Sequence, residues 1–219
     1  MSANRLMARL RSFTLLPHTV PRWLTDPIVG VIARTGATPN HLTVLGFLGN
    51  LGAAALAAGG EFLAAGLVLL AASALDLLDG ALARATGRAS PFGAVFDSVL
   101  DRLSEAAVLG GLAFHFAQRG EREETVLAFA ALAGSLMVSY VKARAEAHGL
   151  ELREGLFTRA ERVLLLGVGL IIDQMRIALW ILAVMANATA LQRLYIVWER
   201  FRRVDAPTDE RRGGEERPL

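Results

Sequence analysis

The chain has 219 residues, of which 53% are apolar and 20% are charged, a composition that indicates a membrane protein rather than a soluble domain. Its 23 basic residues nearly balance 21 acidic ones, and the net charge of +2 argues against a nucleic-acid binder, which usually carries a concentrated basic face. The sequence contains no cysteine, which excludes a disulfide framework, a zinc–thiolate site and a thiol nucleophile.

The first part of the chain, residues 1–40, is predicted to be a cytoplasmic segment that includes an amphipathic helix in the membrane interface. The stretch 22–35 is too short and too mixed in polarity to cross a bilayer. Its Trp23 and flanking arginines are typical of a helix that lies along the membrane surface.

Six apolar stretches with roughly the length of a membrane span follow. We therefore predict an all-α integral membrane protein, with a six-helix transmembrane domain over residues 41–200. Residues 201–219 are charged, contain proline and glycine, and are predicted to form a disordered cytoplasmic tail. The six predicted spans are residues 41–59, 62–85, 91–117, 125–147, 159–173 and 177–198.

The basic residues predict the orientation of these spans. If alternate connections lie on opposite sides, nineteen of the 23 lysines and arginines fall on the side that holds both termini and the second-to-third and fourth-to-fifth connections with their flanks. By the positive-inside rule this side is cytoplasmic. We expect a multi-pass protein of the cell (inner or plasma) membrane, with both termini in the cytoplasm.

Four aspartates lie inside the second and third predicted spans, where a bare carboxylate is costly. Asp76 and Asp79 are three residues apart, and Asp97 and Asp101 are four apart, so each pair shares one helix face. Two antiparallel helices joined by a short connection can bring all four together. Four converging carboxylates repel one another unless cations bind among them, and oxygen-only ligands favour hard divalent ions such as Mg²⁺.

The neighbouring residues favour a diphosphate substrate. Gly80 and Gly93 lie one turn from the acids, where the lack of a side chain lets a bulky ligand approach the backbone, and Arg84 can pair with phosphate. Two divalent ions at such a site can clamp the attacking and leaving oxygens of a phosphoryl displacement. These residues predict a metal-dependent enzyme that acts on a diphosphate.

Two other interpretations of the acids remain open. Carboxylates inside membrane spans also serve the ion pathway of a cation- or proton-coupled transporter. Single acids can form structural ion pairs, such as Asp101 with Arg102 or Asp97 with Arg162, although such pairs account for one acid and not for four.

The spacing resembles the signature of the CDP-alcohol phosphotransferases, also called CDP-alcohol phosphatidyltransferases. Residues 76–101 follow the pattern D-x2-D-G-x2-A-R-x8-G-x3-D-x3-D with every fixed position matched. The resemblance extends over roughly residues 20–200, including the six-span layout. It implies transfer of a phosphoalcohol from a cytidine-diphosphate-linked donor to a hydroxyl acceptor, with release of CMP.

The resemblance also implies roles for individual residues. Asp101 would be the catalytic base that takes the proton of the acceptor hydroxyl, which agrees with the need for a base beside the bound phosphate. For Asn40 and Thr43, simple helix N-capping is an alternative to ligand contact. Two divalent ions, Mg²⁺ or Mn²⁺, would be held by Asp76, Asp79, Asp97 and Asp101. The CDP group would contact Asn40, Thr43, Asp76, Gly80, Ala83, Arg84 and Gly93.

The acceptor is indicated by the stretch 139–146, Ser-Tyr-Val-Lys-Ala-Arg-Ala-Glu, and by the later pair Glu161-Arg162. Both resemble the inositol-phosphate branch of the family, the phosphatidylinositol phosphate synthases. This resemblance implies CDP-diacylglycerol as the donor and an inositol phosphate, or another polar alcohol, as the acceptor. Its phosphate would bind in a cationic pocket formed by Ser139, Lys142, Arg159, Arg162 and Arg193.

Alternatives to this acceptor pocket stay open on the sequence alone. A phosphatidylglycerophosphate synthase-like enzyme would take glycerol 3-phosphate, which is also anionic. Arg144, Arg159 and Arg162 could instead anchor the protein beside lipid headgroups. The resemblance further implies a homodimer in contact with membrane lipids, and no nucleic-acid partner is expected.

Overall fold

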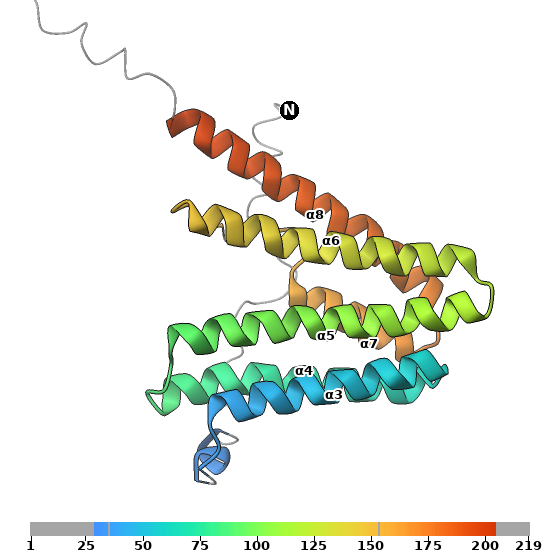
Figure 1. Cartoon of the computed structure of the whole chain (residues 1–219), viewed down its shortest axis with the longest axis horizontal. Helices are drawn as coiled ribbons and strands as arrows, with labels where there is room; N and C mark the ends of the chain where they lie inside the picture. The colour runs from blue at the N-terminus through green and yellow to red at the C-terminus, as the bar shows by residue number, and fades with distance from the viewer. Residues whose placement is uncertain (1–28, 35, 153, 205–219) are drawn as a thin grey trace, which may run out of the picture.

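The computed structural model describes residues 29–34, 36–152 and 154–204, and Figure 1 shows their arrangement. Regular structure in these ranges is entirely helical, as predicted, without a strand. Beyond the helical residues 29–34, the helices coincide with the six predicted stretches apart from a few residues at their ends. They are α3 (Pro39–Gly59), α4 (Phe62–Ala85), α5 (Pro91–Gln118), α6 (Arg122–Ala147), α7 (Arg159–Ile171) and α8 (Met175–Val204).

The two predicted terminal segments lie mostly outside the described residues. Of the predicted interfacial stretch, residues 29–34 are helical. Of the predicted tail, residues 201–204 continue α8, so the prediction that the tail begins at residue 201 is wrong. The longer helix has a local cause, because the guanidinium carbon of Arg202 lies over the ring of Trp198, 5.4 Å from its centroid and one turn along the same face.

Helix starts follow from capping residues in the sequence. Thr38 caps α3, with its side chain accepting a hydrogen bond from the backbone N–H of His41, and Ser90 caps α5 in the same way. α3 therefore begins two residues before the predicted start at residue 41. Because Thr38 is the cap, the N-capping interpretation of Asn40 and Thr43 is wrong, and their side chains need another explanation.

Four of the described helices are long and apolar enough to cross a membrane, namely α3, α4, α6 and α8 up to residue 202. α5 has 28 residues but carries four charged side chains between residues 97 and 105, at Asp97, Asp101, Arg102 and Glu105. α7 has 13 residues, which corresponds to about 20 Å of helix against a hydrocarbon core of about 30 Å. By length and composition, α5, which carries two of the four acids, and α7 depart from an ordinary span.

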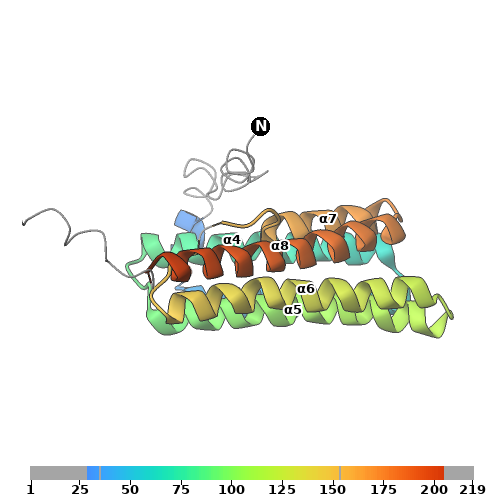
Figure 2. The ribbon, with the colours of Figure 1, turned by 90° about the horizontal axis from the view of Figure 1, so that it is seen from above.

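The helices form two layers of three that pack face to face (Figures 1 and 2). One layer contains α3, α5 and α6, and the other contains α4, α7 and α8. Neighbouring helices contact one another within each layer. The two layers are joined at their edges by extensive contacts of α3 with α4 and of α6 with α8, so the six helices form a closed ring. α7 begins part of the way along the bundle and runs to the end where α3 meets α4 (Figure 1).

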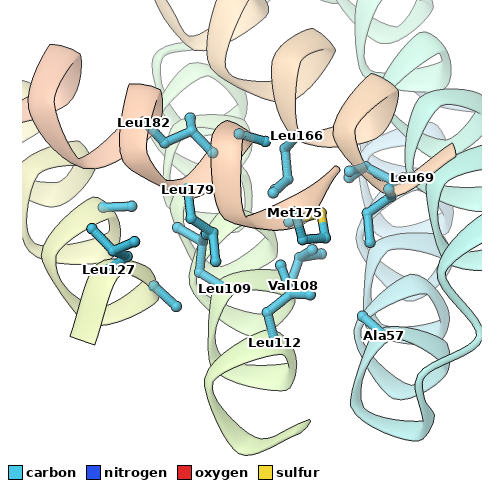
Figure 3. Close-up of a cluster of buried hydrophobic side chains, with 14 of the residues drawn as sticks. Ala57, Leu69, Val108, Leu109, Leu112, Leu127, Leu166, Met175, Leu179 and Leu182 are labelled. Carbon is cyan, nitrogen blue, oxygen red and sulfur yellow. The ribbon is translucent and has the colours of Figure 1, made fainter. Parts of the chain in front are cut away.

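The core lies between the two layers and receives side chains from every helix from α3 to α8 (Figure 3). In a bilayer, close packing rather than expulsion of water holds such helices together. The core is rich in leucine and alanine and carries no charge, so it stabilises the bundle beside the acids. The residues labelled in Figure 3 are Ala57, Leu69, Val108, Leu109, Leu112, Leu127, Leu166, Met175, Leu179 and Leu182.

Candidate active site

The predicted acids come from the C-terminal half of α4 and the N-terminal half of α5, which belong to opposite layers. The Nη2 atom of Arg159, the first residue of α7, joins the two helices. It lies 3.1 Å from Asp76 Oδ2 on α4 and 2.7 Å from Asp101 Oδ1 on α5. The side chains of Asp76 and Asp101 are 7% and 18% exposed, and that of Arg159 is 30% exposed. A single guanidinium therefore bridges two largely buried carboxylates.

The other acid of α4, Asp79, is held by α3. The hydroxyl of Thr43 donates a hydrogen bond of 2.6 Å to Asp79 Oδ2, and both residues are buried. Thr43 Oγ1 also lies 3.1 Å from the carbonyl oxygen of Pro39, so this side chain connects the first turn of its own helix with an acid 36 residues away in the sequence. A hydrogen bond to an ionised acceptor is stronger than one between neutral groups, so this contact fixes the orientation of the Asp79 carboxylate.

Gly46 is a site residue that the sequence analysis missed. A Cβ atom at Gly46 would overlap Asp76 Oδ1 and would lie 3.3 Å from the carbonyl oxygen of Ala72. Glycine at this position therefore lets α3 pass close to α4 at the level of the acid. The sequence holds a glycine one turn after Thr43, but nothing local shows that the backbone faces a carboxylate.

The fourth acid shows that the site suits a cation. Asp97 Oδ1 is buried and has no hydrogen-bond partner, and an unpaired buried carboxylate oxygen is costly unless a cation satisfies it. Within the described ranges, no three acid or histidine side chains are already placed to hold a metal ion. Nevertheless, the donor set of four carboxylates and the unsatisfied oxygen fit hard divalent ions such as Mg²⁺ or Mn²⁺.

A cavity of about 220 Å³ lies next to the acids, between the start of α3, the end of α4 and the start of α5. Six of the seven residues predicted to contact CDP line it, whereas Asp76 does not. Arg88 and Ser90 also line the cavity and were missed, because they lie in the variable spacer of the motif. The predicted residues in the lining are Asn40, Thr43, Gly80, Ala83, Arg84 and Gly93.

The five residues predicted for the acceptor phosphate occupy different environments. Ser139 is half-buried on α6, and Lys142, one turn later, lies 3.7 Å from Glu146 Oε1. Arg193 on α8 is buried and donates to the backbone carbonyls of Glu154 at 2.9 Å and Val138 at 2.8 Å.

The remaining two predicted pocket residues, Arg159 and Arg162, lie one turn apart on α7. Arg162 is 3% exposed at its side chain, and it donates to both carboxylate oxygens of Glu105 at 2.7 and 2.9 Å and to the carbonyl of Phe157. Arg159 carries the two aspartate contacts described above. Thus one arginine of α7 reaches the acids and the other holds α7 against α5.

Glu105 is the most informative residue that the sequence analysis missed. It is buried, and its ion pair with Arg162 joins the two layers directly beside the acids. Its signal was present, because Asp97, Asp101 and Glu105 recur every four residues and share one face of α5. The structural ion pairs considered as an alternative, Asp101 with Arg102 and Asp97 with Arg162, are not formed: Arg102 donates to Ser98, and Arg162 pairs with Glu105.

Comparison with known proteins agrees with the family resemblance of the motif. The family model for CDP-alcohol phosphatidyltransferase matches residues 36–198. This range includes the whole motif and the helices α3, α4, α5 and α7, which carry or contact the four aspartates. The archaetidylinositol phosphate synthase of Pyrococcus horikoshii is 39% identical over 176 residues, covering 78% of this chain and 88% of that protein.

Two solved structures of the Mycobacterium tuberculosis phosphatidylinositol phosphate synthase have the same fold. Each superimposes with a TM-score of 0.75 at 34% identity and covers 80% of this chain. The match covers 93% of the structure with CDP-DAG bound and 88% of the structure in complex with manganese and citrate. The similarity therefore includes relatives that bind a nucleotide lipid and a divalent metal.

Proposed function

The chain belongs to the CDP-alcohol phosphatidyltransferase family, and on this basis we propose that it transfers the phosphatidyl group of CDP-diacylglycerol to the hydroxyl of an inositol phosphate and releases CMP. The observation that carries the proposal is the position of the four motif aspartates. Asp79 and Asp97 line a cavity together with six of the residues expected to contact the CDP group. Asp76 and Asp101, on the same two helices, are joined by Arg159. The relatives named as inositol-phosphate enzymes support the choice of acceptor.

In this proposal the cavity at the start of α3 and α5 binds the CDP group. Arg84 and Arg88 at its rim can pair with the negative charge of the diphosphate. Gly80 and Gly93 leave the backbone open to the ligand on two sides of the cavity. This places the reacting phosphorus next to Asp97, which lines the same cavity.

The chemical step is a displacement at the phosphorus that carries the diacylglycerol. Asp101 takes the proton of the acceptor hydroxyl, and that oxygen forms a bond to the phosphorus as the bond between the phosphorus and the bridging oxygen of CMP breaks. CMP departs with the bridging oxygen. Two divalent ions, Mg²⁺ or Mn²⁺, held by Asp76, Asp79, Asp97 and Asp101, would neutralise the charge of the diphosphate.

The acceptor phosphate is proposed to bind on the side of the acids opposite the CDP cavity. Arg159 is the residue of the predicted pocket that contacts the acids, and Lys142 at the end of α6 is the most exposed of its cations. Ser139, Arg162 and Arg193 complete the predicted pocket, the two arginines by holding α7 and the connection before it in place.

The membrane setting is part of the same proposal. The chain is a multi-pass membrane protein, and we propose that α5 and α7 lie in the membrane with the four helices that are apolar enough to span it. The distribution of basic residues supports a site and both termini on the cytoplasmic side. A homodimer is expected from the family resemblance.

CMP release from CDP-diacylglycerol and Mg²⁺ tests the function. Purified protein should release CMP with an inositol phosphate as acceptor, and Asp101→Asn should lower the rate by about 10²–10⁴-fold, the usual contribution of a general base. Asp173→Asn is the matched control, because Asp173 is exposed at the opposite end of the bundle. No CMP release with any acceptor would refute the function.

The same assay identifies the acceptor. Labelled inositol phosphate and labelled glycerol 3-phosphate are offered in turn, and the lipid product is separated and counted. We expect the label in the lipid with inositol phosphate. Label only with glycerol 3-phosphate would keep the reaction class and overturn the acceptor.

A further inference from the structure

Arg159 contacts the acids through one nitrogen only. Its Nη2 atom lies 2.7 Å from Asp101 Oδ1 and 3.1 Å from Asp76 Oδ2. Its Nε atom is buried and has no hydrogen-bond partner. Arginine has five donors in a planar fork and binds anions best when two nitrogens act together. The guanidinium of Arg159 therefore pairs with the two carboxylates through Nη2, while its Nε donor makes no hydrogen bond.

Arg162, one turn later on the same helix, is the opposite case. Two of its nitrogens bind both oxygens of Glu105, and a third contact reaches the carbonyl of Phe157. Its side chain is 3% exposed, against 30% for Arg159. Of the two arginines, Arg162 is enclosed and hydrogen-bonded through all three of its nitrogens, whereas Arg159 is partly exposed and contacts the acids through one.

The contacts of Arg159 involve the carboxylates that the proposed function assigns to divalent ions. Asp76 and Asp101 come from opposite layers, and one positive charge between them reduces their repulsion. A guanidinium within 3.1 Å of these oxygens and a divalent ion coordinated by the same oxygens would repel each other strongly, because both lie in a largely buried site. Arg159 and a metal ion therefore compete for the same carboxylates.

We propose that Arg159 is a switch that couples metal binding to acceptor binding. Without metal, Arg159 pairs with Asp76 and Asp101. When a divalent ion takes these oxygens, Arg159 leaves them, and its guanidinium becomes free to bind the phosphate of the acceptor. An anionic acceptor then binds well only after the metal. The inference rests on the proposed function for the metal ligands and for the identity of the acceptor.

The first test measures metal affinity without turnover. Titration of Mn²⁺ followed by its electron paramagnetic resonance signal gives the affinity of wild type, Arg159→Gln and Arg119→Gln. Arg119 is exposed at the far end of the bundle, so its variant controls for the loss of one charge. We expect Arg159→Gln to bind Mn²⁺ more tightly by roughly 5- to 150-fold, the range of typical coupling between two sites. Unchanged or weaker binding in this variant would overturn the proposal.

The second test uses the wild-type protein, so it does not depend on whether a variant folds. Binding of inorganic phosphate is measured by calorimetry in EDTA and in Mg²⁺. We expect binding to be at least fivefold tighter in Mg²⁺, and Arg159→Gln to lose this gain. Equal phosphate affinity in both buffers would contradict the switch, as would a full Mg²⁺ effect in Arg159→Gln, which would mean that phosphate binds the metal directly.

Failure of the switch and failure of the proposed function give different results. Both binding tests are independent of the reaction. If the wild type releases CMP but Arg159→Gln shows no change in Mn²⁺ or phosphate binding, the proposed function is supported and the switch is refuted. If Mn²⁺ and Arg159 compete as expected but no acceptor yields CMP, the competition is supported and the proposed function is refuted.

Discussion

At the scale of single residues, the site combines side chains that the motif contains with side chains that it does not. The motif supplies the four aspartates and the two glycines, and Asp79, Gly80, Gly93 and Asp97 line one cavity. Thr43 lies 36 residues from Asp79, and Arg159 lies 83 residues from Asp76, so both contacts come from outside the motif. Each satisfies a buried carboxylate that the membrane would otherwise make costly.

The hydroxyl of Thr43 provides a prediction at this scale. Thr43→Val keeps the shape of the side chain but removes the donor to Asp79. Hydrogen bonds to charged groups contribute about 1.5–3 kcal/mol, so kcat/KM for CMP release should fall roughly tenfold or more. Thr43→Ser keeps the hydroxyl and should retain most of the activity. Equal activity of the Val and Ser variants would show that the contact does not matter for the reaction.

At the scale of helices, the shortness of α7 and the close approach of α3 to its neighbours shape the site. α7 begins part of the way along the bundle, so its first residue, Arg159, lies at the level of the acids rather than at the end of the bundle. α3 approaches α4 closely at Gly46 of α3. It approaches α5 closely at Gly111 of α5, because a Cβ atom on Gly111 would overlap the carbonyl oxygen of Ala54 on α3. Small residues at helix contacts of this kind let backbones approach in a membrane.

Two adjacent glycines on α5 test this packing. Gly111→Ala forces a methyl group against the backbone of α3, and overpacking of this kind costs about 1–3 kcal/mol, so the midpoint of thermal unfolding in detergent should fall. Gly110→Ala is the matched control, because nothing lies within 4 Å of a Cβ atom there. Alanine is favoured over glycine in a helix by about 1 kcal/mol, so this variant should be as stable as wild type or more stable. Equal midpoints for the two variants would argue against a close contact of α3 and α5.

At the scale of the whole molecule, the acids and the apolar core divide the bundle along its length. The acids, the cavity beside them and most basic residues of the described ranges lie toward the end where α4 is followed by α5, while the connections 59–62 and 118–122 lie at the other end (Figure 1). The leucine-rich core between the layers supports the polar site without contributing charge to it.

The orientation of this bundle can be tested because the chain has no cysteine. Ala117→Cys at the end of α5 and Ala147→Cys at the end of α6 are both exposed positions at opposite ends of the bundle. In intact cells, a membrane-impermeant maleimide should label Ala117→Cys, and Ala147→Cys should be labelled only after lysis. The reverse pattern would invert the proposed topology.

The sequence by itself determined the helices, the pairing of acids on helix faces and the division of charge between the two ends. These features depend on local properties, namely apolar length, capping residues and the three- and four-residue spacing that puts side chains on one face. It also contained the signal for Glu105, four residues after Asp101. The sequence therefore predicted most of the fold and the residues of the motif.

Only the tertiary structure decided which groups satisfy these acids. The bridge from Arg159 to Asp76 and Asp101, the contact of Thr43 with Asp79 and the pairing of Glu105 with Arg162 all join different helices. The order in which helices pack around a ring, and the depth at which a short helix begins, are not encoded in the period of any one segment. A buried carboxylate requires a partner, but which residue supplies it depends on how the two layers meet.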